Sequence, residues 1–168
     1  MTETERRTQA LRIDTPDPRI NHLFNTWTKQ QVQLCAQVGR GATRGYRDAL
    51  QDAWGYASFD MEASREKIEE ALMHQYADGH APRAWLPLDE RHYSDSGVWI
   101  SMAVSGYMKE SGDAAFLDKM IPFLDGSMAS VWDHACRAMD FLYRDRGAHG
   151  LPLAHSGDWN DSLTGMGK

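Results

Sequence analysis

The chain has 168 residues, of which 42% are hydrophobic, so it is long enough for one globular domain with a buried core. Its formal net charge is -6 and its isoelectric point lies near 5.6. Because a nucleic acid or an anionic membrane surface would require a basic patch, the charge argues against both as partners and favours a neutral substrate.

The chain contains two cysteines, Cys35 and Cys136, and each occurs inside an apolar helical pattern without a second Cys or a His at ligand spacing. We expect both to be reduced core residues. No apolar run approaches the roughly 20 residues that span a bilayer, and residues 1–20 lack the apolar segment of a signal peptide. The sequence therefore predicts a cytoplasmic protein that does not bind a membrane.

Residues 1–20 are polar and contain a Thr-Pro-Asp-Pro run, which predicts an arm or an inter-domain linker. Apolar residues at intervals of three and four then predict helices over residues 23–38, 48–59, 61–76, 96–110, 113–124 and 127–144. Asp60 is the expected N-cap of the third helix, and Gly112 the expected end of the fourth. The last helix has one stripe of larger apolar side chains, formed by Trp132, Cys136, Met139 and Tyr143.

Residues 78–91 contain two prolines and a glycine and are expected to form a long ordered loop. No segment shows the two-residue alternation of a strand, so the predicted fold class is all-α. Helices joined by loops of unequal length suit a bundle or a helical toroid, and the long loops favour the toroid. The chain ends in a polar loop without a closing helix, which indicates that residues 21–168 are the N-terminal part of a domain truncated at its C-terminus.

A first polar cluster occupies residues 44–52, where Asp48 and Asp52 stand four residues apart on one helix face. The macrodipole favours carboxylates near a helix start, so solvated capping charges are one interpretation. The other is a sugar clamp, in which carboxylates and arginines bind vicinal hydroxyls while Tyr46 or Trp54 stacks on the sugar ring.

A second polar cluster, residues 93–99, includes Asp95 and by itself predicts only the cap of the following helix. A third, residues 150–162, places two carboxylates, an amide, an indole and an imidazole in a glycine-bounded loop. Glycosidic cleavage requires a carboxylic acid aimed at the leaving oxygen, and an adjacent indole can stack on the sugar and raise the pKa of that acid by desolvation. A turn or capping role for Asp158 or Asp161 is the alternative.

Other kinds of site find little support in the sequence. The histidines form no helical pair at metal-ligand spacing, so no metal site is predicted. The chain also lacks a P-loop, a dinucleotide-binding glycine pattern and the frame of a nucleophile elbow.

Taken together, these segments resemble the inverting glycoside phosphorylases of the cellobiose and chitobiose phosphorylase type, glycoside hydrolase family 94. The matching segments are residues 44–52, residues 111–118 and above all Gly-Leu-Pro at 150–152, which leads to Gly-Asp-Trp-Asn-Asp at 157–161. The resemblance runs from about Trp27 to the C-terminus and implies an (α/α)6 barrel with its active site in the loops at one end. Many members, including the phosphorylase-like domains of cyclic β-1,2-glucan synthases, carry Ser-Asp-Asp where this chain has Ser-Asp-Ser at residues 94–96.

The resemblance implies that Asp161 is the general acid that protonates the glycosidic oxygen. Inorganic phosphate, as co-substrate, would attack the anomeric carbon with inversion and give an α-sugar 1-phosphate, so no cofactor is expected. The substrate-binding residues that it implies are Arg47, Asp48, Asp52, Asp95, Trp159 and Asn160.

The main hypothesis is therefore phosphate-dependent cleavage, or reverse synthesis, of a β-linked glucosyl disaccharide or oligosaccharide. A hydrolase on the same barrel and a non-catalytic carbohydrate-binding helical module are the alternatives. The phosphate-binding residues are expected downstream of this chain, so the chain alone is expected to be inactive. The resemblance is also compatible with a homodimer of the full-length protein.

Overall fold

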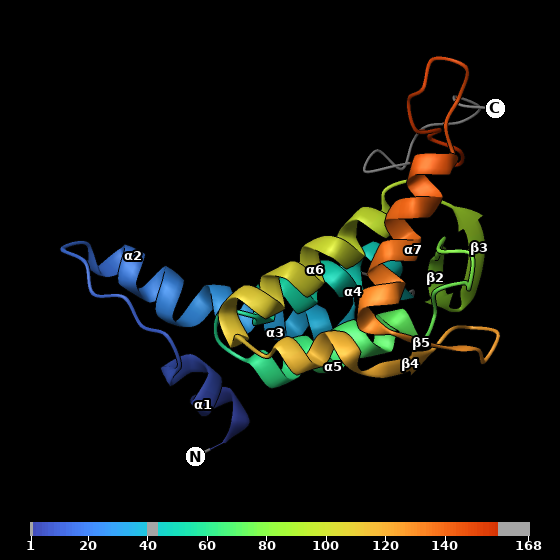
Figure 1. Cartoon of the computed structure of the whole chain (residues 1–168). Helices are drawn as coiled ribbons and strands as arrows, with labels where there is room; N and C mark the ends of the chain where they lie inside the picture. Colours follow the sequence, from blue (N-terminus) through green and yellow to red (C-terminus); the bar gives the residue numbers. More distant parts are fainter. Residues whose placement is uncertain (1, 40–43, 158–168) are drawn as a thin grey trace.

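The computed structural model describes residues 2–39 and 44–157, and helices dominate this part of the chain (Figure 1). They are α1 (Glu3–Gln9), α2 (Pro18–His22), the π-helical turn η1 (Leu23–Trp27), α3 (Thr28–Val38), α4 (Tyr46–Tyr56), α5 (Met61–Leu72), α6 (Ser96–Ser111), the 3-10 helix η2 (Ala114–Asp118) and α7 (Val131–Arg144). The prediction of a predominantly helical chain is confirmed. No helix in the described ranges is long and apolar enough to cross a membrane.

Two small antiparallel sheets accompany the helices, so the prediction that the chain is all-α is wrong in this respect. One sheet has the order β1-β2-β3 and the other pairs β4 with β5; their strands are β1 (Arg44–Gly45), β2 (Pro82–Leu86), β3 (Leu88–His92), β4 (Met120–Pro122) and β5 (Met128–Ser130). The predicted loop over residues 78–91 thus forms most of the β2–β3 hairpin. The buried positions of β2 are Pro82 and Ala84, which give none of the large apolar alternation that identifies a strand.

Several helix boundaries agree with the predicted ones. The Asp60 carboxylate caps α5 by accepting a hydrogen bond from the Ala63 amide, and Gly112 ends α6 in the left-handed conformation. The helix predicted over residues 113–124 is wrong beyond η2, because the chain then enters β4. The helix predicted from residue 127 starts at Val131, because β5 precedes it.

The core lies where α4, α5 and α6 pack against one another, with α7 lying across α6 (Figure 1). Leu50 of α4, Ile68 of α5, Ile100 of α6 and Val131 of α7 are all 0% exposed. Burial of one such side chain stabilises the fold by about 1.5–3 kcal/mol. Each of these helices therefore contributes to one shared apolar cluster.

A buried polar pair fixes α7 against the turn that follows α5. Gln75 and His134 are fully buried, and Gln75 Oε1 lies 2.7 Å from His134 Nδ1. Gln75 Nε2 donates to the carbonyl oxygen of Gly79, and His134 Nε2 lies 3.1 Å from the carbonyl oxygen of Ile121. Burial holds the pKa of His134 below its usual value. Because an unpaired buried polar group costs about 1–3 kcal/mol, these contacts favour one placement of α7.

The four larger residues of the predicted apolar stripe of α7 are not its buried face, whereas Val131, which widens that stripe, is buried. Val131 and His134 are buried, whereas Trp132 and Tyr143 are 58% and 67% exposed. Cys136, on the same stripe, is free and only half-buried, as is Cys35, so the expectation that the two cysteines are core residues is wrong.

The N-terminal segment, predicted to be a polar arm or linker, contains α1 and contacts the helices that follow. The buried Asp60 carboxylate pairs with Arg6 and Arg7. The Lys29 ammonium of α3, itself buried, donates to the backbone carbonyl oxygens of Thr8, Ala10 and Leu11. These contacts join residues 6–11 to α3 and to the start of α5.

We expect Gly79→Ala to destabilise the fold by about 2–4 kcal/mol. Gly79 has a φ of 107°, and a β-carbon there would lie 2.0 Å from the carbonyl oxygen of Arg137 in α7. Gly126→Ala is the matched control, because Gly126 also has a positive φ, 86°, but nothing lies within 4 Å of its added β-carbon. Urea denaturation compares the two variants, and equal losses of stability would contradict the close approach of this loop to α7.

Candidate active site

A solvent-open pocket lies where α4 and α6 begin, beside the β2–β3 hairpin. The pairing of β1 with β2 places Gly45 opposite Ala84 and so brings the start of α4 to the hairpin, while β3 leads directly into α6. Three of the predicted substrate-binding residues, Arg47, Asp48 and Asp95, line this pocket together. The complete lining is Gly45, Arg47, Asp48, Arg83, Ala84, Tyr93, Asp95 and Ser96.

The Asp95 carboxylate is held through one oxygen, while the other is buried without a described partner. Arg47 Nη1 and Trp99 Nε1 each donate to Asp95 Oδ2 at 3.1 Å. Asp95 Oδ1 is buried and has no hydrogen-bond partner among the described residues. A buried acceptor without a donor costs about 1–3 kcal/mol, so this oxygen is suited to accept a hydrogen bond from a bound hydroxyl group.

The two carboxylates of α4 do not line the same set of cavities. Asp48 lines the pocket and also a smaller neighbouring cavity, whereas Asp52, 7% exposed, lines only the smaller one beside Cys35 and Lys67. The structure thus brings Asp48 to Arg47 and Asp95 and places Asp52 one helical turn farther along α4. A contact between Asp52 and a sugar stays a prediction.

Neither aromatic residue suggested as a sugar platform lines this pocket. Tyr46 is 0% exposed and packs edge-on against Trp85 in the core, so a stacking role for it is wrong. Trp54 lines a different groove, between α4 and α6, beside Gly106.

Arg83, which lies outside the three predicted polar clusters, also lines the pocket, as does Tyr93 at the start of the second cluster. The Arg83 guanidinium lies over the Tyr93 ring, 5.4 Å from its centroid, and donates to Asp89. A hydrogen bond from Arg91, assisted by the one from Arg83, holds the pKa of Asp89 well below its usual range. A recognised β2–β3 hairpin would have been the signal, because Arg83 lies on β2 and Tyr93 directly follows β3.

The loop that follows α7 returns to the end of β3. The Ser94 amide donates to the Gly157 carbonyl oxygen at 3.0 Å, and the Ser156 amide donates to that of His92 at 3.1 Å. Gly157 is therefore bonded to the residue that precedes Asp95. The predicted general acid, Asp161, follows in the sequence. It lies outside the described residues, as do Trp159 and Asn160.

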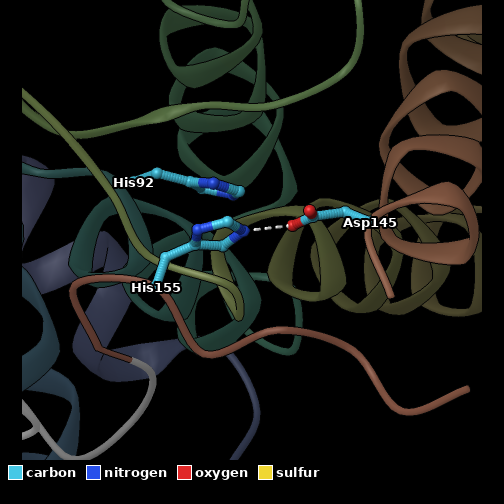
Figure 2. A group of neighbouring side chains, drawn as sticks. All are labelled: His92, Asp145 and His155. Atoms are coloured by element: carbon cyan, nitrogen blue, oxygen red, sulfur yellow. Dashed lines mark hydrogen bonds and ion pairs between the residues drawn. The ribbon is translucent and has the colours of Figure 1, made fainter. Parts of the chain in front are cut away.

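Figure 2 shows three polar side chains in this region, His92, Asp145 and His155. Their potential ligand atoms lie within 4.8 Å of one another, so this group could hold a metal ion, although its members are too far apart in sequence to be recognised by spacing. However, His155 Nε2 lies only 2.5 Å from Asp145 Oδ2. As described, these two side chains are in direct hydrogen-bonding contact.

His92 predicts a pH dependence of stability. Burial, followed by the nearby His155, lowers the pKa of His92 to about 4. In the unfolded chain a histidine binds its proton near pH 6.5. Above that pH both states are neutral, and between about pH 6.5 and 4 only the unfolded state is protonated, so the free energy of unfolding falls as the pH falls through this window. Urea denaturation across the window should show a weaker pH dependence for His92→Gln, and parallel curves would contradict the assignment.

Comparison with known proteins identifies the family. Residues 4–168 match the model of the glycosyl hydrolase 94 superfamily catalytic domain. The chain is 47% identical to solabiose phosphorylase of Paenibacillus borealis over 99% of its length, and 30% identical to 3-O-beta-D-glucopyranosyl-beta-D-glucuronide phosphorylase of the same organism over 96%. It is also 30% identical to cellobionic acid phosphorylase of Neurospora crassa over 94% of its length.

The match covers only part of each relative, since the chain spans 22% of the first two proteins and 21% of the third. It includes the β2–β3 hairpin, the pocket at the starts of α4 and α6, and the loop that follows α7. On this match, which agrees with the resemblance carried by the Gly-Asp-Trp-Asn-Asp run, the chain belongs to the glycosyl hydrolase 94 superfamily, within its catalytic domain.

Proposed function

We propose that this chain supplies the donor-sugar side of the active site of an inverting glycoside phosphorylase. The observation that carries the proposal is the Asp95 carboxylate, which lines the pocket, is fixed by Arg47 and Trp99, and has one buried oxygen without a hydrogen-bond partner among the described residues. Fixed carboxylates and guanidinium groups are suited to bind the hydroxyls of a sugar. Asp48, Asp52, Trp159 and Asn160 complete the proposed set of substrate-binding residues.

In the proposed reaction, Asp161 donates its proton to the glycosidic oxygen while an oxygen of inorganic phosphate attacks the anomeric carbon. The bond from that carbon to the glycosidic oxygen breaks, the bond to phosphate forms on the opposite face, and an α-sugar 1-phosphate leaves. Phosphate takes the place of the base-activated water of an inverting hydrolase, so one protein carboxylate suffices and no cofactor is required.

Phosphorolysis is favoured over hydrolysis and over mere carbohydrate binding because the relatives described above are phosphorylases by name. The identity of 47% makes solabiose the first disaccharide to test. The phosphate-binding residues, a homodimer and a cytoplasmic location remain predictions for the full-length protein.

The finer fold assignment that we propose is part of an (α/α)6 barrel, with residues 21–168 as its N-terminal portion. The exposed stripe on α7 supports this, because Trp132, Met139 and Tyr143 are 58%, 46% and 67% exposed in the chain as described. Further helices of a barrel would cover such a stripe.

The general acid is tested by Asp161→Asn in the full-length protein. We expect phosphorolysis to fall by about 10²- to 10⁴-fold with little change in sugar binding, because only the proton donor is lost. Wild type and variant are incubated with a panel of β-glucosides, with and without phosphate, and sugar 1-phosphate is assayed. Near-normal turnover by the variant would exclude Asp161 as the acid, and cleavage without phosphate would indicate a hydrolase.

The sugar contact is tested by Asp95→Asn, which keeps the shape of the side chain but removes its charge. We expect KM for the disaccharide to rise about fivefold, because a hydrogen bond to a charged acceptor is worth roughly 1 kcal/mol more than one to a neutral acceptor. Asp140→Asn is the control, since Asp140 is exposed on α7. Equal KM values for the two variants would remove Asp95 from the sugar site.

A further inference from the structure

The end of β3 meets the region after α7 through three side chains, His92, Asp145 and His155, which we call the histidine clasp (Figure 2). His92 ends β3, Asp145 follows α7, and His155 lies in the loop that leads to Asp161. His155 Nε2 contacts Asp145 Oδ2 at 2.5 Å, and the rings of His92 and His155 stack with their centroids 4.3 Å apart. The clasp therefore joins this loop by side-chain contacts to both β3 and the end of α7.

The clasp is partly shielded from solvent. The side chain of Asp145 is 19% exposed and that of His155 is 30% exposed. On its other side His92 packs against Phe141 and His80, with ring centroids 5.1 and 5.6 Å apart. A hydrogen bond to a carboxylate that is partly removed from water is stronger than a fully exposed ion pair, so the clasp can restrict the loop.

The backbone at His155 indicates that these contacts hold a strained conformation. His155 has a φ of 52°, in the left-handed region that is uncommon for residues other than glycine. This conformation costs about 1 kcal/mol and persists where the surrounding contacts fix it. Backbone pairing with Tyr93 and the side-chain contact with Asp145 are such contacts.

The loop held by the clasp leads directly into the proposed general acid. Gly157, two residues after His155, is bonded to the Ser94 amide beside Asp95, and Asp161 is four residues further on. General-acid catalysis depends on the position of the donor, since a misplacement of 1 Å can cost about 100-fold in rate.

We propose that the histidine clasp positions the loop that carries the general acid, so that the Asp161 proton is directed at the glycosidic oxygen. The inference rests on the proposed function above. His92, Asp145 and His155 are positioning residues, because they act on the loop and are not proposed to touch the substrate. The proposed action of the clasp is through the direct contact between His155 and Asp145.

The test uses His155→Gly in the full-length protein. Glycine adopts a φ of 52° without strain, so this variant removes the imidazole and leaves the backbone conformation accessible. Two substrates are compared: the native disaccharide, whose leaving group needs a proton, and a dinitrophenyl β-glucoside, whose leaving group departs without one. His149→Gly is the control, because His149 is an exposed histidine in the same loop.

We expect His155→Gly to lower kcat for the disaccharide about 10- to 100-fold, with KM within about twofold of wild type and with activity on the dinitrophenyl β-glucoside retained. Asp145→Ala is expected to give the same selective loss, and the double variant to lose no more than either single variant, since both residues form one contact. Equal losses on both substrates, or no loss, would overturn the proposal. Loss of wild-type activity on treatment with EDTA would also overturn it, in favour of a metal site.

Asp161→Asn separates this inference from the proposed function. If that variant loses the disaccharide but retains the dinitrophenyl β-glucoside while His155→Gly resembles wild type, the clasp alone is refuted. If Asp161→Asn shows no selective loss of activity on the disaccharide, the assignment of Asp161 as the general acid is refuted, and with it the proposed function on which the clasp proposal rests.

Discussion

The pairing of β1 with β2 is the constraint on which the pocket depends. It sets Gly45 opposite Ala84, so the first turn of α4 lies beside the hairpin whose second strand leads into α6. Arg47 and Asp95, 48 residues apart in sequence, can then form a hydrogen bond. The shared core of α4, α5 and α6 keeps both helix starts in place. Site geometry in this chain therefore follows from a very short strand interaction supported by helix packing.

A single segment, residues 92–95, takes part in each feature of the site. His92 stacks on His155, the Ser94 amide bonds to Gly157, and Asp95 presents its carboxylate to the pocket. The contacts that hold the loop and the contact proposed to hold the sugar are thus separated by only a few bonds of backbone. A shift of this segment would move sugar recognition and the loop before the proposed acid together, which is how preorganised sites are maintained.

The helices could be predicted because their apolar residues recur with the helical period. The role of Asp161 as the acid stays a prediction. The hairpin could not be predicted, since Pro82 and Ala84 occupy its buried positions. Because the hairpin was not predicted, Arg83 was not expected to line the pocket. Tyr46 was suggested to stack on a sugar, but it packs edge-on against Trp85 of the hairpin. The histidine clasp could not be predicted either, because His92 is far in sequence from Asp145 and His155.

The charges of the pocket are consistent with a reaction that requires phosphate. Two arginines, Arg47 and Arg83, and two aspartates, Asp48 and Asp95, line it, so its charged side chains balance. Ser96, 2% exposed, stands where resembling proteins carry a second aspartate after the one matching Asp95. A third carboxylate here would give the lining a net negative charge and oppose the approach of a phosphate dianion, unless another cation offset it. With Ser96, the lining holds two arginines against two aspartates and has no net charge.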